Sequence, residues 1–414
     1  MSLAVLSVCA LALAIVVSCV TTLNVGVLAL ALAWIIGVYF GGMPVNAVMA
    51  GFPTQLFLTL TGMTLLFTMA QCNGTLDRLA HHAVRLCRGN RGVIPIMFFV
   101  LGAALASIGP GNISTAAILA PMAMVTASRI GIPLFLMAIM VGNGSNSGSL
   151  SPFAPTGIIV NGLMARNGMT GMEMPTYLYN LLAHVAVAFA GYFLFGGLKL
   201  FTGHSSVRAD ELDPSPESDV AFQARHWTTL GVIASLILSV LFFGVNVGMG
   251  AFLASVVLVL SGSADDGEAV KRMPWRVIVM VCGVTVLIAL LEKAQGIDLL
   301  VSLVARVSNA DTVTAVVAFL TGIISVYSST SGVVLPAFLP MVPGLAQQLG
   351  ADPIGIASSM NVGGHLVDVS PLSTIGALCL AGAPVEEARE LFNKLLAWGL
   401  SMTIVGGVLC YFVF

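Results

Sequence analysis

Long apolar runs follow one another along almost the whole chain, and this pattern constrains the fold more than any other feature. A helix needs about 20 apolar residues to cross the hydrocarbon core of a bilayer. The sequence therefore predicts an all-α polytopic membrane protein with about ten transmembrane crossings. The predicted crossings lie near residues 3–22, 25–41, 53–72, 132–165, 177–200, 227–245, 248–261, 276–294, 353–382 and 391–413.

The composition requires a lipid bilayer as partner. Of 414 residues, 58% are hydrophobic and 8% are charged, whereas a soluble domain has roughly 25% charged residues. A water-soluble protein of this length could not cover its surface with so few charges. The formal net charge is −2. The chain therefore lacks the excess of basic residues typical of nucleic-acid binding, and we expect no nucleic-acid partner.

Two further apolar segments are interrupted in the middle by turn-forming residues. Residues 92–128 are broken by Gly109-Pro110-Gly111-Asn112, and residues 311–347 are broken by Ser328-Ser329-Thr330-Ser331. Each segment is long enough for two half-length helices, and these residue types favour turns. We predict two re-entrant hairpins that enter and leave the membrane on the same side. Two ordinary kinked helix pairs are the alternative.

The distribution of Lys and Arg predicts an orientation. If the N-terminus lies outside, 13 of the 16 basic residues fall on the cytoplasmic side, and only Arg166, Lys293 and Arg306 fall outside. Cytoplasmic loops of membrane proteins carry such an excess of Lys and Arg. We therefore predict that both termini lie outside and that the polar stretch 202–226 is cytoplasmic.

Short motifs recur at an offset that stays between 218 and 222 residues. A fixed offset indicates an internal repeat. We predict a first repeat in residues 1–200, a linker in 201–226 and a second repeat in 227–414. Each half contains an odd number of predicted crossings, so the two repeats would be inverted, as in many secondary transporters. The matched pairs are Asn24-Val25-Gly26 with Asn246-Val247-Gly248, Gly62-Met63-Thr64 with Gly283-Val284-Thr285, Asp77 with Asp298, Ala120-Pro121-Met122 with Leu339-Pro340-Met341, Ser151-Pro152 with Ser370-Pro371, and Thr156 with Thr374.

Four polar segments interrupt these apolar surroundings, two in each half. They are residues 107–115, 142–157, 325–332 and 361–376. Unwound backbone at membrane depth is tolerated where it is buried or lines a wet cavity. There its N–H groups and helix N-termini can face carboxylates, and its carbonyl and side-chain oxygens can face sodium. No Lys or Arg lies in the four segments, so neutral donors would hold an anion.

His365 and Asp368 are the only ionisable residues in the four segments. Ionisable groups at membrane depth are functional candidates. Asp368 could bind a cation or carry a proton, and His365 could do the same or assist a carboxylate. The alternative is that the two pair with each other or face a wet vestibule. His184, on an apolar helix, is interpreted as a packing histidine.

Enzyme motifs are missing from the sequence. It contains no phosphate-binding loop, no HExxH and no Gly-x-Ser-x-Gly elbow. We therefore predict that the chain is not an enzyme and needs no cofactor. Its energy would come from a gradient of sodium ions or protons.

At the four polar segments the chain resembles the ion transporter superfamily, and more specifically the bacterial malonate/dicarboxylate carriers. The segment GNGSNSGSLSPFAPTG carries the most specific likeness. More distantly, the hairpin tips GNIST and STS resemble the Ser-Asn-Thr tips of the divalent anion:sodium symporter family. Neither tip reads Ser-Asn-Thr intact, and the symporters mostly have neutral residues where His365 and Asp368 stand. A proton therefore remains an alternative to sodium.

The resemblance implies an elevator-type homodimer in the bacterial inner membrane. Its scaffold would be residues 1–91 and 227–310, and its moving transport domain would be residues 92–200 and 311–414. Together with His365 and Asp368, the implied binding residues are Asn112, Ser114, Thr115, Asn143, Ser145, Asn146, Ser151, Thr156, Ser329, Thr330, Ser331, Asn361, Ser370, Ser373 and Thr374. The candidate sodium ligands are Ser107, Asn112, Asn143, Asn361 and Asp368.

The predicted function is cation-coupled symport of a small dicarboxylate such as malonate or a C4 acid, with sodium favoured. Export or exchange of another anion, such as a tricarboxylate or an oxyanion, is one alternative. A channel-like anion pore is another, and a non-transporting membrane scaffold is a third. Paired interruptions in both halves favour a carrier over a pore.

Overall fold

The computed structural model describes residues 2–85, 90–201 and 222–414, and the regular elements in these ranges are all helical. Within the described residues, nine helices are long and apolar enough to cross a membrane, and five shorter apolar helices accompany them. The predicted all-α polytopic membrane fold is confirmed. Residues 202–221, which form most of the predicted linker, lie outside the described residues.

The first half of the chain contains α1 to α10 and a short 3-10 helix. These elements are α1 (Leu3–Val20), α2 (Val25–Trp34) continued by η1 (Ile35–Phe40), α3 (Val45–Met49), α4 (Thr54–Cys72), α5 (Thr75–Arg85), α6 (Val93–Ile108), α7 (Gly111–Ile130), α8 (Leu134–Ser147), α9 (Pro155–Arg166), α10 (Glu173–Leu194) and η2 (Gly197–Phe201).

The second half repeats this order of helices. Its elements are α12 (Ala224–Phe243), α13 (Val247–Leu260), α14 (Asp266–Arg272), α15 (Trp275–Lys293), α16 (Gly296–Ala305), α17 (Val313–Ser325), η3 (Thr330–Val334), α18 (Leu335–Phe338), η4 (Leu339–Met341), α19 (Val342–Leu349), α20 (Pro353–Leu366), η5 (Val367–Val369), α21 (Thr374–Ala381) and α22 (Val385–Val413). α1 thus corresponds to α12, α6 to α17, α8 to α20 and α10 to α22.

Two long helices begin before the apolar runs that predicted them. α10 begins at Glu173 instead of near residue 177, and α22 begins at Val385 instead of near residue 391. Acidic residues occupy the first turn of both helices. A negative charge there interacts favourably with the positive end of the helix dipole, so each helix continues beyond its apolar part.

Glycines of the repeated motifs allow helices from opposite halves to cross in close contact. α2 packs against α15, and α13 packs against α4. A Cβ atom on Gly283 would collide with the backbone of Gly26, and one on Gly62 would collide with the backbone of Gly248. Small residues permit such close approach of helix backbones in membranes. The repeated motifs therefore specify the same crossing twice.

Both predicted interruptions lie at the turn between two helices. The first turn, between α6 and α7, has Gly109 at φ 150° and Gly111 at φ 77°, which are conformations that favour glycine. In the second turn, after α17, Ser329 caps η3 by accepting a 3.2 Å hydrogen bond from the backbone N–H of Gly332. We call these turns the first and second hairpin tips. The side from which each hairpin enters the membrane stays a prediction.

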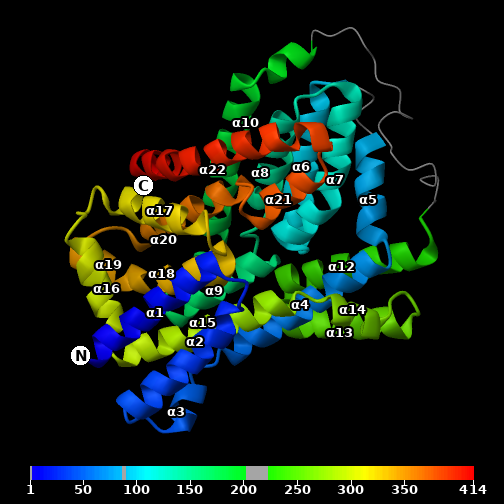
Figure 1. Ribbon diagram of the computed structural model, residues 1–414. Coiled ribbons are helices and arrows are strands. Elements are labelled where there is room, and N and C mark those ends of the chain that lie inside the picture. The colour runs from blue at the N-terminus through cyan, green and yellow to red at the C-terminus, as the bar shows by residue number, and fades with distance from the viewer. Residues whose placement is uncertain (1, 86–89, 202–221) are drawn as a thin grey trace.

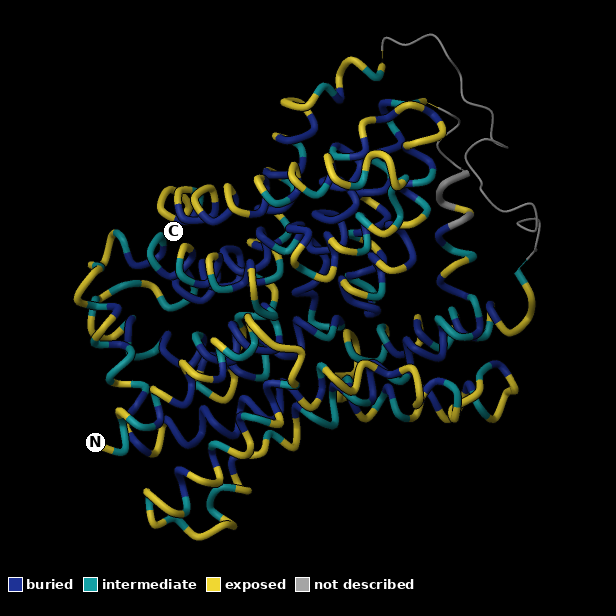
Figure 2. Tube along the Cα trace, viewed as in Figure 1, coloured by how far each residue is buried: buried dark blue, intermediate teal, exposed yellow. Residues whose placement is uncertain are grey.

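The helices form two groups (Figure 1). The lower group in this view contains α1, α2, α3, α13, α14 and α15, and the upper group contains α6, α7, α8, α10, α17, α20, α21 and α22. Buried residues run through the interior of both groups, whereas the outer faces are mostly exposed (Figure 2). The predicted division into a scaffold and a transport domain concerns relative movement, so it stays a prediction.

Candidate functional site

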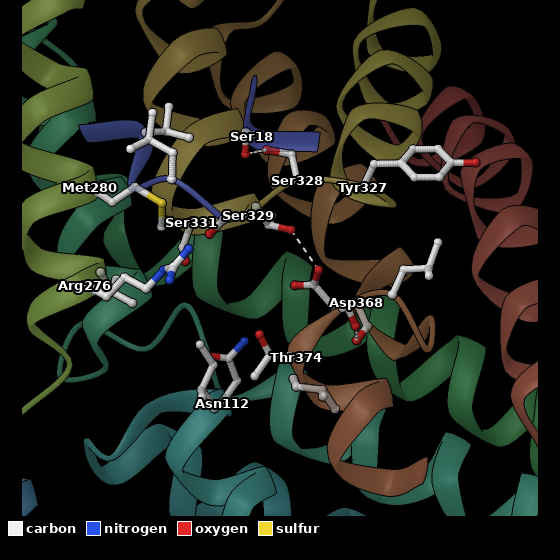
Figure 3. A pocket seen from close by; sticks show the side chains of 18 of the residues that line it. Ser18, Asn112, Arg276, Met280, Tyr327, Ser328, Ser329, Ser331, Asp368 and Thr374 are labelled. Carbon is white, nitrogen blue, oxygen red and sulfur yellow. Dashed lines mark hydrogen bonds between the residues drawn. The ribbon is translucent and has the colours of Figure 1, made fainter. Parts of the chain in front are cut away.

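A cavity of about 290 Å³ lies where both hairpin tips meet the break between η5 and α21. Its volume is at the lower end of the roughly 300–1,000 Å³ range of small-molecule pockets. The end of α1, the start of α2 and the start of α15 complete its wall (Figure 3). The exposed side chains of Tyr327 and Leu372 also line it, so the cavity reaches the surface of the protein.

The structure brings seven of the predicted binding residues into this cavity, from both halves of the chain. They are Asn112, Ser329, Thr330, Ser331, Asp368, Ser373 and Thr374. A smaller adjoining cavity of about 100 Å³ is lined by Ser114 and Thr156. Because Asn112 and Ser331 line both spaces, the two cavities are neighbours.

Each hairpin tip is hydrogen-bonded to the broken helix of its own half. Asn112 Nδ2 donates to Asn146 Oδ1 over 2.9 Å. In the second half, Thr330 Oγ1 lies 3.3 Å from the carbonyl oxygen of Gly364. In both pairs the partners are 34 residues apart in the chain, so each tip is attached to the broken helix of its half at a similar place.

Asp368 brings a carboxylate to the cavity wall. Its Oδ1 accepts a 2.8 Å hydrogen bond from Thr330 Oγ1. Its backbone carbonyl accepts a hydrogen bond from Ser373 Oγ, which also lies 2.8 Å from the carbonyl oxygen of Ser370. The carboxylate is half-buried and has no cationic partner among the described residues. Such an arrangement can attract a cation or a proton.

The remaining predicted residues lie behind the cavity, in the packed interior, and do not line it. They are Thr115, Asn143, Ser145, Asn146, Ser151, Asn361, His365 and Ser370. His365 Nδ1 lies 2.8 Å from the carbonyl oxygen of Asn361. Among the described residues, both side-chain amide atoms of Asn361 and Nε2 of His365 lack a protein partner. Buried polar atoms of this kind commonly face a water molecule or an ion.

The five candidate sodium ligands do not gather in one place. Asn112 and Asp368 share the larger cavity, whereas Ser107 lines neither cavity. Ser107 Oγ lies 2.6 Å from the carbonyl oxygen of Ala103 and 2.9 Å from the hydroxyl of Tyr177. Asn143 Oδ1 lies 2.8 Å from Nδ1 of His184. The packing role predicted for His184 thus includes holding a candidate site residue.

Five polar side chains at this cavity were not among the predicted binding residues. Tyr327 and Ser328 lie within a predicted polar segment, whereas Ser18, Thr21 and Arg276 lie outside all four segments. Ser18 Oγ and Ser328 Oγ are 2.8 Å apart, which joins α1 to the second hairpin tip (Figure 3). Arg276 belongs to the first turn of α15. From the sequence it was placed only among the 13 basic residues predicted to lie on the cytoplasmic side. Its contacts with residues about 250 positions away could not be read from local sequence.

Residues 1–149 match a family model described as the dicarboxylate carrier protein MatC N-terminus. Over these residues the chain matches the dicarboxylate carrier family. The predicted family resemblance is confirmed there, and the matched range includes the first hairpin tip and α8 up to Ser147. The dicarboxylate carrier match supports a transporter rather than an enzyme.

The fold is similar to that of a solved structure, whose title reads "Crystal structure of the Alcanivorax borkumensis YdaH transporter reveals an unusual topology". The TM-score is 0.62, and the match covers 89% of this chain and 86% of that chain. Sequence identity is 17%, so the likeness concerns the fold alone. No curated protein matches the chain in sequence.

Proposed function

We propose that the protein is a secondary active transporter that carries small dicarboxylates by symport with a cation. The observation that carries this proposal is the cavity in which both hairpin tips meet Asp368. Sodium is the favoured coupling ion and a proton is the alternative. The substrate class is that of the carrier family matched by residues 1–149, such as malonate or a C4-dicarboxylate.

Neutral donors around the cavity suit a carboxylate substrate. The hydroxyl groups of Ser329, Ser331 and Thr374 and the amide of Asn112 line the space. Asn112 lies in the first turn of α7, and Thr374 begins α21. Helix N-termini favour anions because their N–H groups and dipole face the ligand. One carboxylate of the substrate would therefore bind between the two tips.

Asp368 supplies the reason for cation coupling. Two like charges about 4 Å apart repel by about 4 kcal/mol at an effective dielectric constant of 20. A dianion entering the cavity would meet this repulsion unless Asp368 were protonated or bound to sodium. The unwound carbonyls and hydroxyls beside Asp368 are ligands that transporters use for sodium. Cation binding would therefore favour substrate binding, and the converse must also hold.

An elevator movement is consistent with the origin of the cavity walls. The two tips and Asp368 belong to the proposed transport domain, whereas Ser18, Thr21 and Arg276 belong to the proposed scaffold. Movement of the transport domain would carry the tips away from the scaffold wall together with the substrate. A homodimer in the bacterial inner membrane, with both termini outside, completes the proposal.

Uptake by proteoliposomes tests the proposed function. We expect purified protein to accumulate radiolabelled malonate or succinate above equilibrium under an inward sodium gradient, and not under a potassium gradient. Accumulation under a pH gradient without sodium would identify the proton, and not sodium, as the coupling ion. Equilibration without accumulation under either gradient would contradict symport, and non-saturable flux would indicate a pore.

A further inference from the structure

Arg276 and Asp368 place opposite charges on the wall of one cavity without pairing with each other. Both residues line the cavity of about 290 Å³, and no ion pair joins them in the described part of the chain. Asp368 accepts from Thr330, and Arg276 Nη2 donates to the carbonyl oxygen of Thr22 over 2.8 Å. In Figure 3 the guanidinium of Arg276 extends from the edge of the cavity toward its interior. Both charges are thus available to a ligand.

We propose that Arg276 selects dicarboxylates by pairing with the second carboxylate of the substrate while the first carboxylate lies at the hairpin tips. This inference rests on the proposed function and adds the residue that distinguishes a dianion from a monoanion. A guanidinium has five N–H donors. One of them is used by Thr22, and the described residues accept no other hydrogen bond from this side chain. The remaining donors can form the bidentate pair that arginine makes with carboxylates.

The backbone around Arg276 fixes its position at the cavity. Asn24 Nδ2 donates to the carbonyl oxygen of Arg276 over 3.0 Å, while Asn24 Oδ1 caps α2 through the N–H of Gly26. Together with the bond to Thr22, this forms a reciprocal clamp between the α1–α2 loop and the start of α15. A side chain held in this way loses less conformational entropy on binding a ligand.

Helix stability does not explain a cation at this position. Arg276 lies in the first turn of α15, where a positive charge faces the positive end of the helix dipole and is unfavourable. The guanidinium and the helix N-terminus together create a positive potential at the cavity wall. That potential favours an anion in the cavity.

The charge occurs in only one of the two repeats. At the offset of 221 residues that relates Gly62 to Gly283, the position equivalent to Arg276 is Gln55, which is neutral. A role in packing shared by both repeats would place similar residues at both positions. In inverted repeats, a charge in one copy belongs to one side of the membrane. Arg276 therefore binds substrate only when the cavity faces the side of the α1–α2 loop, which is the cytoplasmic side in the predicted orientation.

A pair of ligands that differ in one charge tests the proposal. Equilibrium binding of succinate and of monomethyl succinate is measured on purified wild-type protein and on Arg276→Gln in the presence of sodium. We expect the wild type to prefer succinate. We expect Arg276→Gln to weaken succinate binding about 10- to 100-fold, as expected for loss of a hydrogen-bonded charge, and to leave the binding of the monoester within about threefold.

Three further variants separate charge from structure. Arg272→Gln removes a neighbouring exposed arginine, which pairs with Glu268 and lines neither this cavity nor the adjoining one. We expect this variant to bind both ligands like the wild type. Asn24→Ala loosens the clamp but keeps the guanidinium, and should retain the preference for succinate. Arg276→Lys keeps the charge without the planar fork, and should show an intermediate preference even if Arg276→Gln does not fold.

The outcomes distinguish this inference from the proposed function. A wild type that binds neither ligand contradicts the proposed function. A wild type that prefers succinate, with the same preference in Arg276→Gln, overturns the role of Arg276 alone. If Arg276→Gln does not fold, the other two variants decide. The role of Arg276 is overturned if Asn24→Ala loses the preference for succinate while Arg276→Lys keeps the full preference, because the clamp would then be the cause.

Discussion

The side-chain amide of Asn146 donates a hydrogen bond to the backbone carbonyl of His365, 3.4 Å away, and the two residues are 219 positions apart in the chain. The same offset relates Ser151 to Ser370 in the repeat. Asn146 and His365 are therefore equivalent residues of the two halves, and they touch. Equivalent residues can meet only near the axis that relates the repeats, so the broken helices α8 and α20 meet at that axis.

Removing the Asn146 side chain should weaken the site and the fold together. Asn146→Ala leaves Asn112 Nδ2 without its acceptor. It also removes one hydrogen bond to the carbonyl oxygen of His365, which keeps the one from the backbone N–H of Val367. A buried donor left unpaired costs about 1–3 kcal/mol. We expect a lower thermal unfolding temperature and weaker dicarboxylate binding. Asn167→Ala is the control, because this half-buried side chain donates to the carbonyl oxygen of Leu163 within the same helix end. We expect it to change neither the unfolding temperature nor the binding appreciably.

Neutralising Asp368 should separate binding from coupling. Asp368→Asn retains an acceptor for Thr330 Oγ1 but removes the charge that would repel a dianion. We expect the variant to bind the dicarboxylate without a coupling cation and to lose accumulation driven by a sodium or pH gradient. Counterflow exchange should persist. Asp311→Asn, on the exposed turn before α17, serves as the control. Gradient-driven accumulation that survives in Asp368→Asn would refute the role of Asp368.

A cross-link between Ser18 and Ser328 should block transport reversibly. Their hydroxyl oxygens are 2.8 Å apart, and they belong to the proposed scaffold and transport domain respectively. Cysteines with suitably close Cβ atoms can form a disulfide. In a background without the native cysteines, we expect oxidation of Ser18→Cys/Ser328→Cys to abolish uptake and reduction to restore it. In the variants with only one of the two cysteines, we expect uptake to be unaffected by oxidation. Undiminished uptake by fully cross-linked protein would contradict the elevator movement.

The crossing of α2 and α15 should not tolerate a side chain at Gly283. A methyl group there would collide with the backbone of Gly26, and overpacking costs about 1–3 kcal/mol. We expect Gly283→Ala to lower the unfolding temperature of purified protein. Gly231→Ala is the matched control, because a Cβ on Gly231 meets no atom within 4 Å and alanine favours the helix. Equal stability of the two variants would count against the crossing.

The sequence was sufficient to predict the hairpin tips because turn-forming residues interrupt long apolar runs. The turns at Gly109–Gly111 and Ser328–Ser329 lie where those interruptions stand. Asp368 could be singled out for a similar reason, since a charge among apolar residues is conspicuous. These predictions depend only on local composition.

The face that each polar residue presents could not be predicted. Asn143 and Asn361 lie within polar interruptions, yet both are fully buried behind the cavity. Whether such a residue faces a cavity depends on where its helix ends. α8 continues to Ser147 and α20 to Leu366, so both asparagines lie inside a helix and not at its open end. Arg276 was missed because its neighbours Thr22 and Asn24 are about 250 residues away in the chain.

Equilibrium binding of succinate as a function of sodium concentration tests the central claim most directly. If a cation at Asp368 is required before a dianion can enter the cavity between the two tips, the apparent Kd of the purified protein must fall as sodium rises, at constant ionic strength and pH. A parallel fall with decreasing pH at zero sodium would assign the same role to the proton. An apparent Kd that responds to neither cation would contradict the account.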